Sequence, residues 1–123
     1  MITGVVNAYC EAIIRLPIRG STGQEQEIEA IVDTGFDGWL TLPTVVIAAL
    51  GLTWSGRGRA ILADGSESLF DTYEVEVIWD SRPRQIPVDA IEADSLVGMS
   101  LLHGYNLHIQ VVDGGSVTID ALP

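Results

Sequence analysis

The chain carries its most informative segment at residues 30–38, which read Ala30-Ile31-Val32-Asp33-Thr34-Gly35-Phe36-Asp37-Gly38. Apolar residues run directly into Asp-Thr-Gly, and glycines at two of the next positions interrupt a regular strand. We therefore expect Asp33 at the end of a buried strand. One carboxylate there would be a weak catalyst. Two held together cannot both ionise easily, so one keeps a proton while the other acts as a base toward water.

Two segments before this motif alternate apolar and polar residues with a period of two. This alternation is typical of strands with one buried and one solvated face. Residues 19–23 between them have the composition of a turn, so the two segments predict a β-hairpin. The expected inward-facing residues are Ala12, Ile14, Leu16 and Ile18 in the first strand, and Ile28, Ala30 and Val32 in the second.

The remainder of the chain predicts further short strands separated by turn signals. We expect strands at 39–42, 53–63, 69–79, 84–91, 93–97, 106–112 and 116–120, and short helices at 45–50 and 100–103. The pair Asp64-Gly65 is a strong hairpin-turn signal. Thr44 suits the N-cap of the first helix, and Gly51 suits the position after its end. Many short strands at close spacing indicate an all-β barrel or sandwich, in one domain of residues 1–123.

The composition of the chain argues against several classes of partner and cofactor. The chain has 17 acidic and 6 basic residues, a formal net charge of −11, so nucleic acid and membrane surfaces are not expected partners. The single cysteine allows no intrachain disulfide, and one cysteine with two widely spaced histidines allows no zinc cluster, so we expect no metal or cofactor. Cys10 is interpreted as an inert buried thiol. No signal-peptide pattern follows Met1, so we expect a cytoplasmic protein.

The segment at 30–38 resembles the active-site motif of aspartic peptidases, in which apolar residues precede Asp-Thr-Gly. Three later segments match that family in order, and the resemblance covers about residues 10–120. It is strongest to the single-domain, retropepsin-like proteins of bacteria and archaea. It implies a closed acid-protease-type β-barrel with one or two short helices that works as a homodimer. The matching segments are Leu40-Thr41-Leu42-Pro43, Ile61-Leu62-Ala63-Asp64-Gly65-Ser66 and Leu96-Val97-Gly98-Met99-Ser100-Leu101-Leu102.

The resemblance also implies roles for single residues. Asp33 would be the catalytic carboxylate, and two copies of it would activate the water that hydrolyses a peptide bond. The Thr34 hydroxyl would bond across the dimer, and the Gly35 N–H would point at the Asp33 carboxylate. Asp37 would bind the substrate backbone. The hairpin tip would close over the substrate through Ala63, Asp64, Gly65 and Ser66.

The sequence leaves a second class of function open. Asp, Thr and Gly all favour turns, so the tripeptide alone is a weak signal. A catalytically silent module of the same fold could dimerise or bind a peptide without cleaving it. Phe36 also departs from the family, which has a small Ala or Ser after the glycine. His103 and His108 lie among apolar residues and are interpreted as structural.

Overall fold

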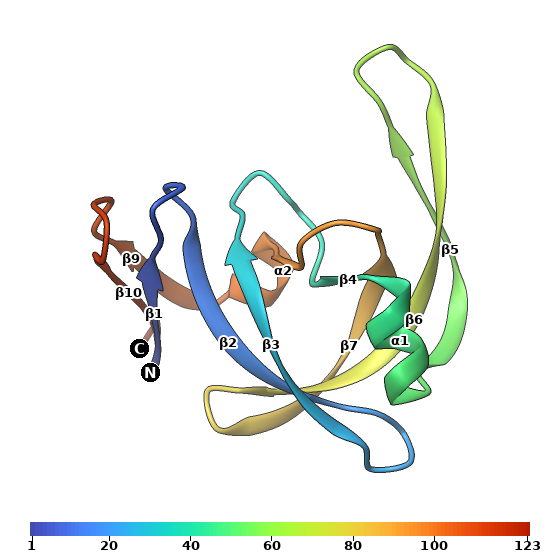
Figure 1. Cartoon of the computed structure of the whole chain (residues 1–123), viewed down its shortest axis with the longest axis horizontal. Coiled ribbons are helices and arrows are strands. Elements are labelled where there is room, and N and C mark those ends of the chain that lie inside the picture. Colours follow the sequence, from blue (N-terminus) through green and yellow to red (C-terminus); the bar gives the residue numbers. More distant parts are fainter.

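The computed structural model describes all 123 residues, and most of them lie in strands. Figure 1 shows the strands curving around a common centre, with one long ribbon projecting from the body. The expected all-β class with one or two short helices is confirmed. The elements are β1 Ile2–Val6, β2 Ala12–Arg19, β3 Glu25–Val32, β4 Thr41–Leu42, α1 Thr44–Leu50, β5 Thr53–Ile61, β6 Glu67–Trp79, β7 Arg82–Ala90, β8 Leu96–Val97, α2 Met99–Leu102, β9 Tyr105–Ile109 and β10 Ser116–Ala121.

The expected closed barrel is wrong, because the sheet stays open. Its strand order is β4-β7-β6-β2-β1-β10-β9, with β3 and β8 branching from β2 and with β5 paired only to β6. The strands β4 and β8 do not pair with each other, and between their segments there is a single bridge, from Leu40 to Val97. Alternation along a strand fixes which face is buried, whereas closure depends on strand tilt and stagger that alternation does not encode.

Strand β1 was not expected from the sequence. It pairs antiparallel with both β2 and β10, and Val5 lies opposite Ile13 on one side. Gly4 interrupts the apolar pattern of this segment. A Cβ at Gly4 would lie 2.1 Å from the Ile13 carbonyl oxygen, so a glycine is needed for the two backbones to approach. The close approach of the two backbones therefore explains why Gly4 is present in β1, although a glycine makes the strand harder to predict from sequence.

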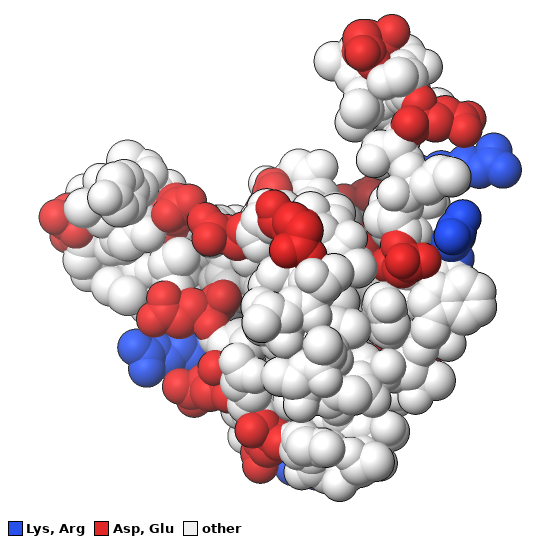
Figure 2. All heavy atoms as spheres, turned by 45° about the vertical axis from the view of Figure 1, so that its right-hand side comes forward, with Lys and Arg blue, Asp and Glu red and all other residues white.

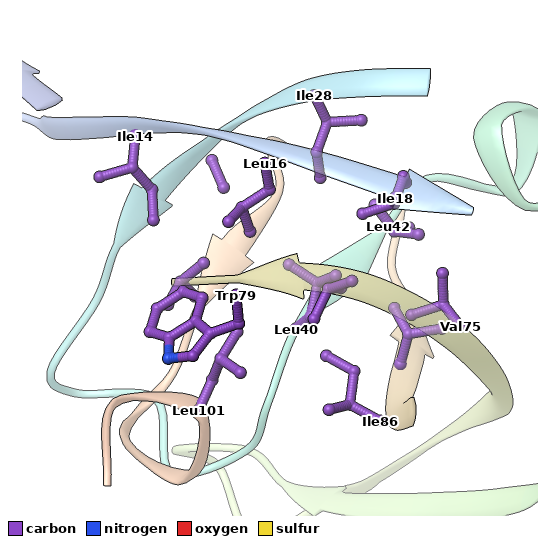
Figure 3. Close-up of a cluster of buried hydrophobic side chains, with 14 of the residues drawn as sticks. Ile14, Leu16, Ile18, Ile28, Leu40, Leu42, Val75, Trp79, Ile86 and Leu101 are labelled. Carbon is purple, nitrogen blue, oxygen red and sulfur yellow. The ribbon is translucent and has the colours of Figure 1, made fainter. Parts of the chain in front are cut away.

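A single cluster of 23 buried apolar residues forms the core. The alternation expected for β2 and β3 is confirmed, since every predicted inward residue is buried. Figure 3 shows side chains from β2, β3, the β4 segment, β6 and β7 converging, with Trp79 next to Leu101 of α2. The exposed fraction of Trp79 is 0 %, and its ring meets Tyr105 edge to face at 5.7 Å between centroids. The core thus ties α2 and β9 to the strands that carry residues 30–38.

Helix α1 begins differently from the expectation. Pro43 occupies the N-cap, and the Thr44 side chain makes no capping bond. Instead, the Thr44 backbone N–H donates to Glu92 Oε1 at 2.8 Å, and this hydrogen bonding lowers the pKa of the Glu92 carboxyl. Gly51 follows the last turn in the left-handed conformation, as predicted. Neither helix combines the length and the apolar character needed to cross a membrane.

Candidate active site

Asp33 directly follows β3, and β8 fixes the position of that strand end. The two strands run parallel, with Ile31 opposite Leu96 and Val32 opposite Val97. The Asp33 backbone N–H donates to the Val97 carbonyl at 2.9 Å, which extends the ladder by one residue. Val32 and Val97 are buried, so the strand end is anchored in the core. The carboxylate therefore projects from a rigid strand end, as the sequence predicts.

The residues after Asp33 form a loop that is bonded to the segment following β8. Met99 N–H donates to Phe36 O at 2.8 Å, and Ser100 N–H donates to Gly38 O at 3.0 Å. The Ser100 hydroxyl donates to Asp37 O at 2.6 Å. These bonds hold the loop against α2 at several points along its length. The segment after β8 thus supports the loop that follows Asp33.

The Asp33 carboxylate accepts a hydrogen bond from within its own loop. Gly35 N–H donates to Asp33 Oδ1 at 2.9 Å, the contact implied by the resemblance. A Cβ at Gly35 would lie 3.2 Å from that oxygen, tighter than an ordinary contact. Asp33 is half-buried in the chain, whereas Thr34 is exposed and its hydroxyl has no partner within the chain. The bond fixes one carboxylate oxygen and leaves Thr34 free to contact another molecule.

Phe36 packs inside the loop. Cβ atoms built at Gly38 and Gly98 would lie 2.5 and 2.6 Å from its ring, so the ring covers both glycines. Gly98 is also constrained by backbone, because its Cβ would lie 2.2 Å from the Gly38 carbonyl oxygen. The φ angle of Gly98 is −101°, which any residue can adopt. Steric room alone thus requires glycine at position 98.

We expect Gly98→Ala to destabilise the protein by about 2–4 kcal/mol, in the range of other severe steric substitutions in a core. The new methyl group would push the 33–38 loop away from α2 and displace Asp33. Urea unfolding followed by circular dichroism measures the loss. A free energy of unfolding within about 0.5 kcal/mol of the wild type, the size of a neutral surface change, would contradict the tight contact.

A second carboxylate lies near the loop, and the sequence interpretation missed it. Asp89 of β7 is half-buried, and its N–H donates to the Leu40 carbonyl at 3.0 Å. Burial raises the pKa of the Asp89 carboxyl, and the negative charge of Asp37 adds to this rise. Asp37 itself is exposed. One flank of the loop therefore carries two interacting acids, and β-strand alternation alone gave no sign that β7 would bring Asp89 there.

Residues 63–66, which the resemblance implies would close over the substrate, form the tip of the β5–β6 ribbon. Asp64 Oδ1 accepts bonds from the Ser66 N–H at 2.9 Å and the Ser66 hydroxyl at 2.6 Å, and these bonds lower the pKa of Asp64. Gly65 has a φ angle of 84°, so the turn needs a residue tolerant of the left-handed region. Figure 1 shows this tip standing well away from the end of β3. The structure thus does not bring residues 63–66 next to Asp33 within one chain.

Two cavities adjoin the motif. A cavity of about 680 Å³ lies on the Thr34 side, and a smaller one of about 250 Å³ includes Asp33 itself. Most of the residues that line these cavities were not among the site residues predicted from the sequence. The larger is lined by Thr34, Asp37, Trp39, Arg84, Met99, Ser100, Leu102, His103, Gly104, Tyr105 and Leu107. The smaller is lined by Val6, Cys10, Glu11, Ala12, Ile31, Val32, Asp33, Ile109 and Val111.

Cys10 corrects one expectation, since its side chain is exposed at the rim of the smaller cavity and is not a buried thiol. Its φ angle is +61°, in the left-handed region, because it lies in the turn between β1 and β2. His103 is exposed at the larger cavity. Alternation could not predict that Cys10 and His103 are exposed at these cavities, because both residues lie outside the strands.

Acidic groups dominate the electrostatics of the molecule. Figure 2 shows carboxylates spread over the displayed face and basic side chains confined to a few places. Four of the six basic residues are paired with carboxylates on the outer surfaces of the sheet and ribbon: Arg15, Arg19, Arg57 and Arg59. Arg84 stacks over the Trp39 ring at 5.5 Å. No basic group makes an ion pair with Asp33 or Asp37.

Comparison with solved structures identifies the fold. The chain superposes on a crystal structure of a retropepsin-like aspartic protease from Rickettsia conorii with a TM-score of 0.60. The match covers 99 % of this chain and 91 % of that one, at 18 % sequence identity. No family model and no curated protein matches the sequence. The chain therefore has a retropepsin-like fold, over nearly its whole length.

Proposed function

We propose that this protein is an aspartic endopeptidase that acts as a homodimer of single-domain chains, with one Asp33 from each chain in a shared site. The observation that carries the proposal is the environment of Asp33. The residue follows the buried end of β3, its carboxylate is bonded to the Gly35 N–H, and its loop is bonded to α2, all within a retropepsin-like fold. This is the kind of rigid support that a catalytic carboxylate requires.

A count of carboxylates supports the dimer. The chain has one Asp-Thr-Gly, and a pair of motif aspartates is needed for acid–base chemistry on water. Asp89 is not a substitute, because it lies on β7 and lines neither of the two cavities beside the motif. A second copy of the chain supplies the missing carboxylate. The exposed Thr34, whose hydroxyl has no partner in its own chain, is then available to bond across the axis.

The proposed reaction needs no metal, cofactor or covalent intermediate. One Asp33 carboxylate accepts a proton from water, which attacks the peptide carbonyl. The other Asp33 holds a proton and polarises that carbonyl, and a proton is then passed to the leaving nitrogen. Asp37 and the tip residues Ala63, Asp64, Gly65 and Ser66 would contact the substrate backbone. The site in which the substrate lies would be completed when the two ribbons close over it.

Cleavage of a diverse peptide library tests the proposed activity directly. A statine-type peptide, whose hydroxyl mimics the tetrahedral intermediate, discriminates the alternative of a silent module. A working pair of carboxylates should bind it far more tightly than the matching peptide that lacks the hydroxyl. Equal binding of the two peptides and no cleavage at any pH would favour a peptide-binding or dimerisation module. A cytoplasmic location and a peptide or protein substrate stay predictions.

We expect the rate to peak on the acid side of neutrality and to fall as the pH rises. Cleavage needs one proton shared by the pair, and loss of that proton at higher pH leaves both groups ionised and no acid for the leaving nitrogen. The pH profile of kcat/KM on one peptide measures this. A rate that keeps rising above neutral pH would contradict a shared proton.

A further inference from the structure

Strand β9 leaves an apolar face partly uncovered beside Thr34. It ends the strand order, so one of its edges is unpaired. Its residues Leu107 and Ile109 lie opposite Ile119 and Val117 of β10 and share their face of the sheet. Ile119 and Val117 are buried, whereas Leu107 and Ile109 are only half-buried. The apolar face of the sheet is therefore buried at β10 but partly exposed at β9.

This face continues into both cavities beside the motif. Leu107 lines the larger cavity together with Trp39 and Met99, whose exposed fraction is 48 %. Ile109 lines the smaller cavity that includes Asp33. Asp33 and Thr34 therefore sit between two apolar hollows of one surface. We name the larger hollow, with its Trp39, Met99, Leu102, Tyr105 and Leu107 walls, the socket.

A rigid turn on the Asp33 side presents the most exposed large apolar side chain of the protein. Tyr9 lies between β1 and β2, and its exposed fraction is 83 %. Asn7 organises the turn: its Oδ1 accepts the Tyr9 and Glu11 N–H groups, both at 3.0 Å, and its Nδ2 donates to Glu11 Oε1 at 2.9 Å. Cys10 and Glu11 of the same turn line the cavity that contains Asp33. Such pre-ordering lowers the entropy cost of docking a side chain.

From these features we infer that Tyr9 of each copy inserts into the socket of the other copy, and that this exchange is the anchor of the dimer. The inference rests on the proposed function, which places a two-fold axis between the Asp33 pair. A two-fold rotation exchanges the two sides of the site. A residue on one side of Asp33 in one copy therefore faces the surface that lies on the other side of Asp33 in the partner copy. The Tyr9 turn lies on the Asp33 side and the socket on the Thr34 side, so each copy offers both halves of the contact.

The chemistry of the socket suits a tyrosine. Its apolar walls can pack against the ring, and the Asp37 carboxylate at its margin can accept a hydrogen bond from the tyrosine hydroxyl. Val45 lies on α1, and Ile61, Leu62 and Leu69 lie on the projecting ribbon, all outside the two cavities. Val111 lines the Asp33 cavity and is 67 % exposed, but it is smaller than Tyr9 and has no hydroxyl to donate to Asp37. Buried aromatic anchors in pockets dominate the energy of many interfaces. Tyr9 therefore also determines whether the catalytic pair assembles.

Sedimentation equilibrium of three variants tests the inference. Tyr9→Ala and Met99→Asp should each weaken dimerisation roughly a thousandfold, because the two-fold axis places every substitution in two anchor contacts. Val45→Asp is the matched control, since it adds the same charge to an exposed apolar helical position outside the socket, and it should leave the dimer constant unchanged. Circular dichroism should show all three variants folded.

Mixing the two defective variants gives the decisive result. A Tyr9→Ala chain keeps its socket and a Met99→Asp chain keeps its tyrosine, so their mixed dimer regains one intact anchor. At a concentration where each variant alone is monomeric, the mixture should form dimers and regain activity. A dimer constant for Tyr9→Ala within about threefold of the wild type, or no gain on mixing, would overturn the anchor while leaving the dimeric enzyme intact. A wild type that is monomeric at every concentration would overturn both.

Discussion

Asp33→Asn should reduce kcat/KM for peptide cleavage by at least about a thousandfold while the protein stays folded. Asparagine nearly matches the shape of aspartate and can still accept the Gly35 N–H through its side-chain oxygen. It cannot accept a proton from water or hold the shared proton, so the chemistry stops while the loop stays bonded. Steady-state cleavage of one peptide, with circular dichroism to confirm folding, measures the effect.

Asp113→Asn is the matched control, because it removes the same charge from an exposed turn between β9 and β10. Its activity should equal that of the wild type. If Asp33→Asn cleaves as fast as this control, Asp33 is not the catalyst. If both variants lose activity equally, the net charge rather than the position is responsible.

The largest concentration effect should appear on dilution, because the site exists only between two chains. Below the dimer dissociation constant, the dimer fraction falls in proportion to total protein. Each tenfold dilution should then lower the activity per chain by about tenfold. Activity assays run beside sedimentation over the same series measure this. A monomer with undiminished activity per chain would refute both the dimer and the two-carboxylate chemistry.

A mixing experiment with the inactive variant makes the same point at fixed concentration. Equal amounts of wild-type and Asp33→Asn chains should distribute statistically, so that only about half of the wild-type chains have a wild-type partner. Cleavage per wild-type chain should therefore fall by about half. An active monomer would show no such loss, because each wild-type chain would work independently of its neighbours.

Much of the fold follows from local patterns in the sequence. The inward faces of β2 and β3, the Asp64–Gly65 turn and the end of α1 at Gly51 were all predictable from periodicity and turn chemistry. These features depend on residues close together in the chain. Strand β1 escaped notice because its Gly4 serves a contact with Ile13, a partner that no local pattern identifies.

The Asp-Thr-Gly motif, its apolar approach and its single occurrence were determined by the sequence itself, and they raised the question of a second copy. Only the tertiary structure decided that the sheet stays open, that Asp89 approaches Asp37, that the Tyr9 turn adjoins the cavity of Asp33, and that the socket adjoins Thr34. The physical reason is range. Alternation and turn propensity act over a few residues, whereas closure, charge proximity and surface complementarity depend on how distant strands pack against one core.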